Sequence, residues 1–258
     1  MARVLVTGGA GGLGSKLTPL LAAAGHEVVA SSRKEREDRD GVHYVRADLT
    51  TGENLTEAVA SARPEVVINL ASSPFRKTWD TDVEGATRIA EAARARPELR
   101  HFIHVGIVGD DQISLGYYKA KAEAERRLRS MDGLPLTVQR ATQFHTLIGE
   151  PLLKLRWAPV LPLATSLRFQ TVDVGEVAQR IASLVDAEPA GGRIEDMGGP
   201  RVMTLGEMAK IAGVRAIPVG MPGRVAQGFR QGLNTCPDGF LGKVTFEEWV
   251  AARRAAED

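Results

Sequence analysis

The stretch TGGAGGLG, Thr7–Gly14, follows a short apolar run and opens a segment in which leucines recur at helical spacing. Three of its glycines, at positions 8, 11 and 14, are spaced three residues apart. In a strand–turn–helix unit, such glycines permit a tight turn and let the backbone approach a pyrophosphate at the helix N-terminus. We therefore expect Thr7–Gly14 to hold the phosphates of a dinucleotide, in preference to a ligand-free glycine-rich hairpin.

Beyond this turn, short runs rich in Val, Ile and Leu alternate with segments of helical periodicity through the first two thirds of the chain. The expected strands are 4–7, 27–30, 43–46, 66–70, 102–105 and 136–140, and the expected helices are 13–24, 54–63, 81–95 and 117–131. The runs are continuously apolar, which is typical of strands buried on both faces. This order predicts an α/β fold, a Rossmann doubly wound parallel sheet with helices on both faces.

The last third of the chain is richer in Gly and Pro and contains expected helices at 174–184, 205–212 and 246–256. We interpret it as a small C-terminal cap on the sheet. The predicted division is a dinucleotide-binding domain at 1–149 plus 171–190 and a substrate-binding cap at 150–170 plus 191–258.

Composition limits the classes of partner. The 258 residues carry a formal net charge of +1, which favours neither nucleic acid nor a membrane surface as a partner. The one cysteine, Cys236, excludes an internal disulfide and suits a reducing compartment. The sequence shows neither a signal-peptide pattern nor an apolar run of spanning length, so we expect a cytoplasmic protein.

The end of the second expected strand bears on the choice of cofactor. An acidic residue there would bind the ribose diol of NAD, but the sequence reads Ala30-Ser31-Ser32-Arg33, with no carboxylate before Glu35. Ser32 and Arg33 suit a 2′-phosphate, so we favour NADP, with NAD as the alternative. Arg33 also begins a charged run, 33–40, which we interpret as a solvated loop.

Several later motifs, together with the glycine turn, resemble the short-chain dehydrogenase/reductase (SDR) superfamily. They are Asp48-Leu49, Asn69-Leu70-Ala71, and Tyr117 followed four residues later by Lys121. The segments HVGIVG (104–109), YYKAKAE (117–123) and RATQFH (140–145) resemble more narrowly its atypical and extended branch, which includes NmrA-like proteins and NAD(P)-dependent epimerase relatives. The resemblance extends from Arg3 to about Gly199.

The resemblance implies a role for each matching residue. The pyrophosphate would lie on the turn, the adenine beside Asp48 and Leu49, the adenosine ribose beside Ala71 and the nicotinamide ribose beside Lys121. The cofactor-binding set expected from the motifs and the resemblance is Gly8, Gly11, Gly12, Leu13, Gly14, Ser32, Arg33, Asp48, Leu49, Ala71 and Lys121.

Tyr117 and Lys121 form the expected catalytic pair. Four residues apart on a helix, they share one face. A free phenol has a pKa of about 10, and a nearby ammonium favours its ionised form, so the pair can exchange a proton with a carbonyl or alcohol while a hydride moves. The alternative is an exposed, charged helix. Tyr118 is the adjacent competitor, but its spacing to Lys121 does not match the superfamily pattern.

One position departs from the catalytic members of the superfamily. Gly106 stands at the end of the fifth expected strand, where those members carry a serine or threonine that binds the substrate carbonyl. Ser72 and Ser73 are possible substitutes. The principal prediction is an NADP-dependent oxidoreductase acting on a small organic carbonyl or alcohol. A non-catalytic NmrA-like NADP sensor and an NAD-dependent epimerase-like isomerase are the alternatives.

Aromatic and apolar residues near strand ends or in the expected cap are candidates for a substrate pocket: Phe75, Ile107, Phe144, His145 and Trp157. The histidines at 101, 104 and 145 have structural roles in our interpretation, and we expect no metal site. The expected partner is a small-molecule substrate, and we expect no direct contact with nucleic acid or membrane. The expected helices 81–95 and 117–131 have Arg- and Glu-rich outer faces, which favour a monomer or weak dimer.

Overall fold

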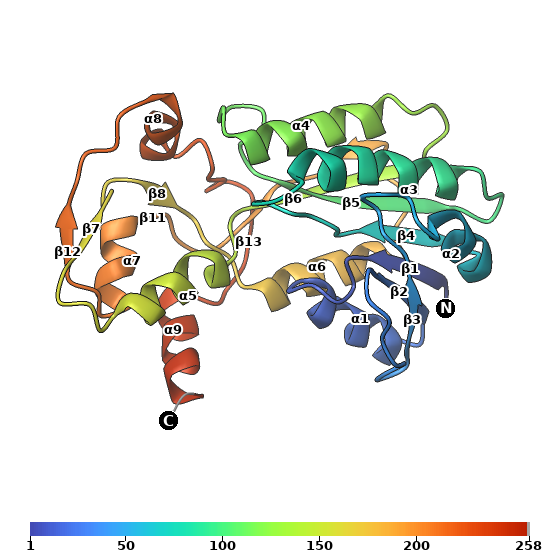
Figure 1. The fold of residues 1–258 in the computed structure, drawn as a ribbon, viewed down its shortest axis with the longest axis horizontal. Helices are drawn as coiled ribbons and strands as arrows, with labels where there is room; N and C mark the ends of the chain where they lie inside the picture. Colours follow the sequence, from blue (N-terminus) through green and yellow to red (C-terminus); the bar gives the residue numbers. More distant parts are fainter. Residues whose placement is uncertain (257–258) are drawn as a thin grey trace. The chain divides into compact units, whose positions relative to one another are not determined.

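The computed structural model describes residues 1–256, which divide into two compact units (Figure 1). The first unit comprises Met1–Gly106, Lys119–Gln139 and Ala178–Ile194. The second comprises Ile107–Tyr118, Arg140–Val177 and the described residues from Glu195 onward. The domain boundaries given above stay a prediction.

The first unit is built on a parallel sheet in the order β6-β5-β4-β1-β2-β3, with β9 beside β6. Its strands are β1 (Arg3–Thr7), β2 (Glu27–Ser32), β3 (Val42–Arg46), β4 (Val66–Asn69), β5 (His101–Ile107), β6 (Leu136–Ala141) and β9 (Gly192–Arg193). Every residue of β4 and β5 is buried, as expected for strands covered on both faces. The predicted Rossmann-type doubly wound sheet is confirmed.

Helices cover both faces of this sheet (Figure 1). They are α1 (Gly14–Ala23), α2 (Leu55–Ala62), η1 (Trp79–Glu84), α3 (Gly85–Arg94), α4 (Gly116–Arg129) and α6 (Val174–Leu184). Leu5, Val67 and Phe102 share a buried apolar cluster with residues of α2, α3 and α4, whereas α1 lies on the other face. Alternate residues of a strand point to opposite faces, so Thr7, Asn69 and His104 point toward α3 and α4 as well.

One helix differs from its prediction in a way that affects the site. The segment expected as a helix at 81–95 begins as the π-helical turn η1 at Trp79 and continues as α3. A π-helical turn is wider than an α-helical one and often occurs at functional sites. It carries the buried side chain of Asp82.

The second unit contains the helices α5 (His145–Leu155), α7 (Leu205–Ile211), α8 (Arg224–Gln231) and α9 (Phe246–Ala255). Its strands are β7 (Leu161–Leu163), β8 (Arg168–Phe169), β10 (Met197–Gly198), β11 (Met203–Thr204), β12 (Ala216–Pro218) and β13 (Phe240–Leu241). β10 joins Ala141 at the end of β6, and β13 joins β10. No helix was expected between 131 and 174, where Gly and Pro become frequent, yet α5 forms there and continues past Pro151.

A shared apolar core holds α5, α7 and α9 of the second unit together. Thr204 and Thr245 cap α7 and α9 through reciprocal capping boxes with Glu207 and Glu248. Across residues 1–256, the helices are too short or too polar to cross a membrane.

Candidate functional site

The glycine turn joins β1 to α1 with a geometry that requires glycine. Gly8 has a φ of +66°, and a Cβ atom there would lie 2.9 Å from the backbone nitrogen of Ala71. A Cβ on Gly14 would collide with the carbonyl oxygen of Gly8. The turn is closed by a hydrogen bond from the Gly11 amide to the Gly8 carbonyl, 2.9 Å long. The first glycine therefore gives the tight turn, and the last lets α1 pack against it.

A cavity of about 630 Å³ opens at the carboxyl ends of the strands of the first unit. Gly8, Ala10 and Gly11 form its floor beside α1, and the loops after β2, β3 and β4 form its walls. Ligands of open α/β sheets bind at this end of the strands. Of the predicted cofactor residues, the cavity is lined by Gly8, Gly11, Ser32, Arg33, Asp48, Leu49 and Ala71.

The remaining turn residues do not line the cavity. Leu13 and Gly14 are buried beneath it, and Gly12 is exposed. Lys121 is likewise outside the lining set.

The wall formed by the loop after β2 is basic. Arg33, Lys34 and Arg36 line the cavity there. The Ser32 hydroxyl oxygen accepts hydrogen bonds from the Lys34 amide and from Nε of Arg36, each 3.3 Å long. The charged run, interpreted from the sequence as a solvated loop, thus directs three cations to the cavity wall. An anionic group at the end of β2 is electrostatically favoured.

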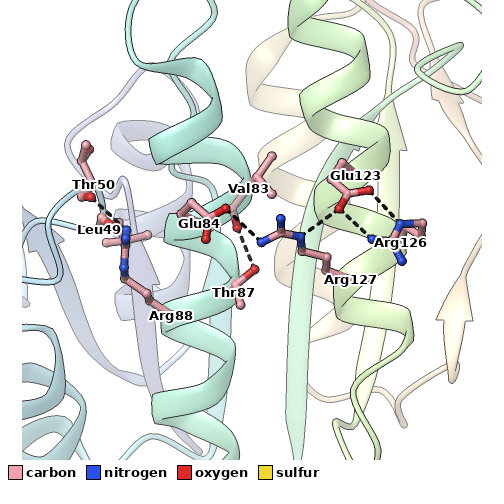
Figure 2. Close-up of polar contacts among 9 residues, drawn as sticks. All are labelled: Leu49, Thr50, Val83, Glu84, Thr87, Arg88, Glu123, Arg126 and Arg127. Atoms are coloured by element: carbon pink, nitrogen blue, oxygen red, sulfur yellow. Dashed lines mark hydrogen bonds and ion pairs between the residues drawn. The ribbon is translucent and has the colours of Figure 1, made fainter.

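The wall formed by the loop after β3 is held by an arginine from α3 (Figure 2). Nη1 of Arg88 donates to the carbonyl oxygens of Leu49 and Thr50, at 2.9 and 2.8 Å. The Thr50 amide donates to the carboxylate of Asp48 over 2.8 Å. These bonds fix the backbone of the segment that the resemblance assigns to the adenine.

An ion-pair network links the end of η1 to α4 on the surface (Figure 2). Arg127 bridges Glu84 at 3.0 Å and Glu123 at 2.9 Å. Hydrogen bonds from Arg126 and Arg127 lower the pKa of Glu123 to about 2. This outer face is charged, as expected from its Arg and Glu residues.

Lys121 lies in a buried polar cluster below the cavity. Its Nζ is 3.3 Å from Oδ1 of Asp82 and donates to the carbonyl oxygen of Val105 over 3.0 Å. Asp82 also accepts from the Ser72 hydroxyl, at 2.6 Å, and from the Ser73 amide, at 2.9 Å. Because Ser72 and Ser73 line the cavity, Asp82 joins the cavity wall to Lys121.

A second buried chain of hydrogen bonds crosses three neighbouring strands. The Thr7 hydroxyl donates to Oδ1 of Asn69 over 2.6 Å, and the Asn69 amide nitrogen lies 3.1 Å from Nδ1 of His104. Since the Asn69 oxygen is the acceptor from Thr7, its nitrogen donates to His104, which places the imidazole proton on Nε2. Burial, with the charge of Lys121 as a smaller cause, lowers the pKa of His104 well below its usual range. His104 is therefore neutral.

Tyr117 is half-buried near the start of α4, in the second unit. It packs beside the buried cluster of Ile107, Ile113 and Tyr118, and its ring meets that of Tyr118 edge to face, 6.1 Å between centroids. The Tyr118 hydroxyl accepts a hydrogen bond from Gln143, and burial raises its pKa. Tyr118 is thus a core residue, which supports Tyr117 as the candidate acid.

The predicted substrate-pocket residues lie in different surroundings. In the first unit, Phe75 is exposed. In the second unit, Ile107 belongs to the buried cluster with Tyr118, and Phe144 is half-buried. His145 packs against the rings of Phe246 and Trp249. Both ring nitrogens of His145 are engaged, Nδ1 with Thr171 and Nε2 with the Val244 carbonyl. Trp157 is exposed and stacked under Arg156. Ile107 and His145 therefore contribute to packing.

Sequence reasoning missed Asp82, Arg88 and Arg36. A sequence signal was available for Asp82, because it shares one buried stripe of the η1–α3 segment with Ala86, Ile89 and Ala93. A carboxylate on such a stripe needs a buried partner. Lys121 is its counterpart on the apolar stripe of α4 that includes Ala124 and Leu128.

Part of the chain is similar in sequence to known proteins. Residues 4–111 match the NAD dependent epimerase/dehydratase family. The chain is 39% identical over 126 residues to UDP-glucose 4-epimerase of Mycolicibacterium smegmatis, covering 42% of this chain and 39% of that protein. It is 37% identical over 103 residues to 3-diazoavenalumate denitrifying reductase of a Streptomyces species, covering 36% and 34%. The matched segments thus span well under half of either relative.

Among solved structures, MoeE5 in complex with UDP-glucuronic acid and NAD superposes with a TM-score of 0.76 over 98% of this chain and 99% of that one. At 18% identity, this likeness shows the fold. The motif resemblance, the match over residues 4–111 and the shared fold agree with one another. Over residues 4–111 the chain thus resembles the NAD dependent epimerase/dehydratase family, and its fold as a whole is similar to that of MoeE5.

Proposed function

We propose that the cavity of the first unit binds NADP(H) and that the protein is an oxidoreductase acting on a small organic carbonyl or alcohol. The observation that carries the proposal is the cavity itself, which has the glycine turn as its floor. The backbone there suits a pyrophosphate, because Gly8 and Gly11 line the cavity without side chains.

The choice of NADP over NAD rests on the basic wall. Ser32, Arg33 and Arg36 line the cavity where the adenosine ribose would lie, and a 2′-phosphate there would meet two guanidinium groups. MoeE5 was solved with NAD, so NAD is the alternative to be measured alongside NADP.

The proposed chemistry uses the two matched residues of α4. When bound, NADPH would supply the hydride. Tyr117 would donate its phenolic proton to the oxygen of the reduced carbonyl, and the resemblance assigns the Lys121 ammonium to the nicotinamide ribose. Lys121 is held for this role by Asp82 and the Val105 carbonyl. A relative described as a reductase supports this reaction class.

A second candidate function is an NADP sensor without catalysis, and the hydroxyl groups near the site favour it. Gly106 offers no side chain to bind a carbonyl. Ser72 donates its proton to Asp82, and Ser73 donates to the Arg76 carbonyl. Losing one such donor typically reduces turnover by about 10²–10³-fold. The match to an epimerase supports a third candidate, an isomerase that retains NAD.

Two measurements test these candidates. Titration of the protein with NADPH and NADH by fluorescence tests binding. If neither nucleotide binds at the highest concentration titrated, the proposal is refuted. Oxidation of NADPH with a panel of quinones, ketones and aldehydes separates reductase from sensor. If turnover is found, Tyr117→Phe should abolish it with nucleotide affinity unchanged, while Tyr118→Phe should retain it. Cofactor carried through purification favours the isomerase.

A further inference from the structure

The strands β7 and β12 form a two-stranded parallel ribbon in the second unit. Leu161, Pro162 and Leu163 are paired with Ala216, Ile217 and Pro218, in that order. Because alternate residues of a strand point to opposite faces, the ribbon has two distinct sides. Leu161, Leu163 and Ala216 pack on the apolar core of the unit, which defines the inner side.

The outer side of the ribbon is apolar and uncovered. By alternation it carries Val160, Pro162, Ile217 and Val219, and the Val219 amide still bonds to the Leu163 carbonyl. Val160, Ile217 and Val219 are 45%, 54% and 44% exposed. Parallel strands are usually covered on both faces, so this ribbon is unusual.

Two further exposed apolar side chains extend the surface. Trp157 is 82% exposed before β7, and Met221 is 48% exposed after β12. We name the set the ribbon surface: Trp157, Val160, Pro162, Ile217, Val219 and Met221.

The two segments of sequence that contain the ribbon surface carry basic side chains and no acidic ones. The segment 151–172 contains three Lys or Arg residues and 208–237 contains four, and neither contains Asp or Glu. The chain as a whole has a net charge of only +1, so this segregation is local. Within residues 1–256, Lys154, Arg215 and Arg224 make no ion pair. In the sequence they lie two or three residues from Trp157, Ile217 and Met221.

Exposed apolar groups bordered by unpaired cations suit an anionic lipid surface. Tryptophan and aliphatic side chains enter the interfacial layer, while Lys and Arg reach the charged headgroups. Each cation near an anionic bilayer contributes about fivefold to binding. A deformable lipid surface accommodates side chains that project from a ribbon, whereas a protein partner would need a complementary shape.

We propose that the ribbon surface docks this protein peripherally on bilayers that contain anionic lipid. The proposal is independent of the nucleotide chemistry, since every residue it uses lies in the second unit. It departs from the expectation, drawn from overall net charge, that the protein has no membrane partner.

Vesicle co-sedimentation of the full chain tests the proposal. Vesicles of phosphatidylcholine with phosphatidylserine should bind the protein about tenfold or more tightly than phosphatidylcholine alone. High salt should weaken this binding, because it screens the cations. Ile217→Asp with Val219→Asp, and separately Lys154→Glu with Arg215→Glu, should each reduce binding about tenfold or more.

Matched controls are Leu20→Asp, an exposed leucine of the first unit, and Lys243→Glu, an exposed lysine outside the two cationic segments. Both should bind vesicles like the wild type. Urea unfolding confirms that each variant is folded. The proposal is overturned if the wild type does not bind anionic vesicles at low salt, or if the ribbon variants bind as the controls do. It is also overturned if ultracentrifugation shows a dimer that Ile217→Asp dissociates.

Discussion

The ammonium nitrogen of Lys121 lies 3.3 Å from Oδ1 of Asp82, and these side chains are only 5% and 0% exposed. Asp82 lies in the π-helical turn, and its carboxylate is also bonded to Ser72 and Ser73 of the cavity wall. The pair therefore connects a lysine on α4 to the loop after β4. Removing one partner of a buried ion pair leaves an uncompensated charge, which is strongly destabilising.

We predict that Asp82→Asn lowers the free energy of unfolding by about 3–5 kcal/mol, because Lys121 loses its buried counter-charge. Lys121→Met should also destabilise, and the double variant should lose less than the sum of the single changes. Urea unfolding of the four proteins measures this coupling. Strictly additive losses would show that the two charges do not stabilise one another.

The partly exposed counterpart is Glu123→Gln, which removes an acid paired with Arg126 and Arg127 at the surface of α4. Although its pKa is about 2, Glu123 is screened by water, so the change in unfolding free energy should be much smaller than for Asp82→Asn.

We predict that Arg88→Ala weakens the binding of NADPH and of ADP-ribose about tenfold. The loss of two charge-assisted hydrogen bonds frees the backbone of Leu49 and Thr50 at the cavity wall. Nicotinamide mononucleotide lacks the adenine half, and its affinity should not change. Arg127→Ala removes an arginine that pairs with Glu84 and Glu123, apart from the contacts of Arg88 (Figure 2), and isothermal titration should show wild-type affinities. Equal effects of the two substitutions would assign Arg88 a general role in stability.

The first unit of the fold could be predicted from sequence because its signals are local. The glycine turn, the apolar runs and the helical periodicity fall within short windows, and the observed β1 and α1 begin within one residue of the expected positions. The cavity-lining residues Ser32, Arg33, Asp48 and Ala71 follow from their positions after strands.

The missed features depend on contacts between distant segments. Arg88 meets Leu49 across 39 residues, and His145 meets Val244 across 99. Contacts between residues so far apart in the sequence leave no periodic pattern from which they could be predicted. The helix α5 was missed for a local reason, since Pro151 lies inside it and usually marks a boundary. The ribbon surface was missed because net charge averages over the whole chain.

We predict that Arg36→Ala raises the dissociation constant of NADPH about tenfold and leaves that of NADH unchanged. The Arg36 guanidinium is held 3.3 Å from the Ser32 hydroxyl, at the wall where a 2′-phosphate would lie. A charge-assisted contact of this kind contributes about 1.5–3 kcal/mol. Fluorescence titration with both nucleotides measures the ratio.

Arg39→Ala provides the matched control, because Arg39 lies further along the same loop, exposed and paired with Asp40. It should leave both affinities unchanged. A parallel loss of NADPH and NADH affinity in Arg36→Ala would argue against recognition of the 2′-phosphate.

We predict that the protein loses stability as the pH falls below about 6.5, the usual pKa of histidine in an unfolded chain. Burial lowers the pKa of His104, and also those of His101 and His145. The folded state therefore holds these rings neutral, while the unfolded chain takes up protons. Stability from this source is complete above about pH 6.5 and falls as the pH drops toward the folded-state pKa values.

Thermal unfolding followed between pH 8 and pH 5 measures the effect, with the melting temperature of the wild type decreasing over the lower part of that range. His104→Gln cannot take up a proton at this position, so its melting temperature should decrease less steeply. The difference between the two proteins at pH 8 gives the packing cost of the substitution, because histidines are neutral there. Parallel curves across the whole range would show that protonation of His104 is not linked to unfolding.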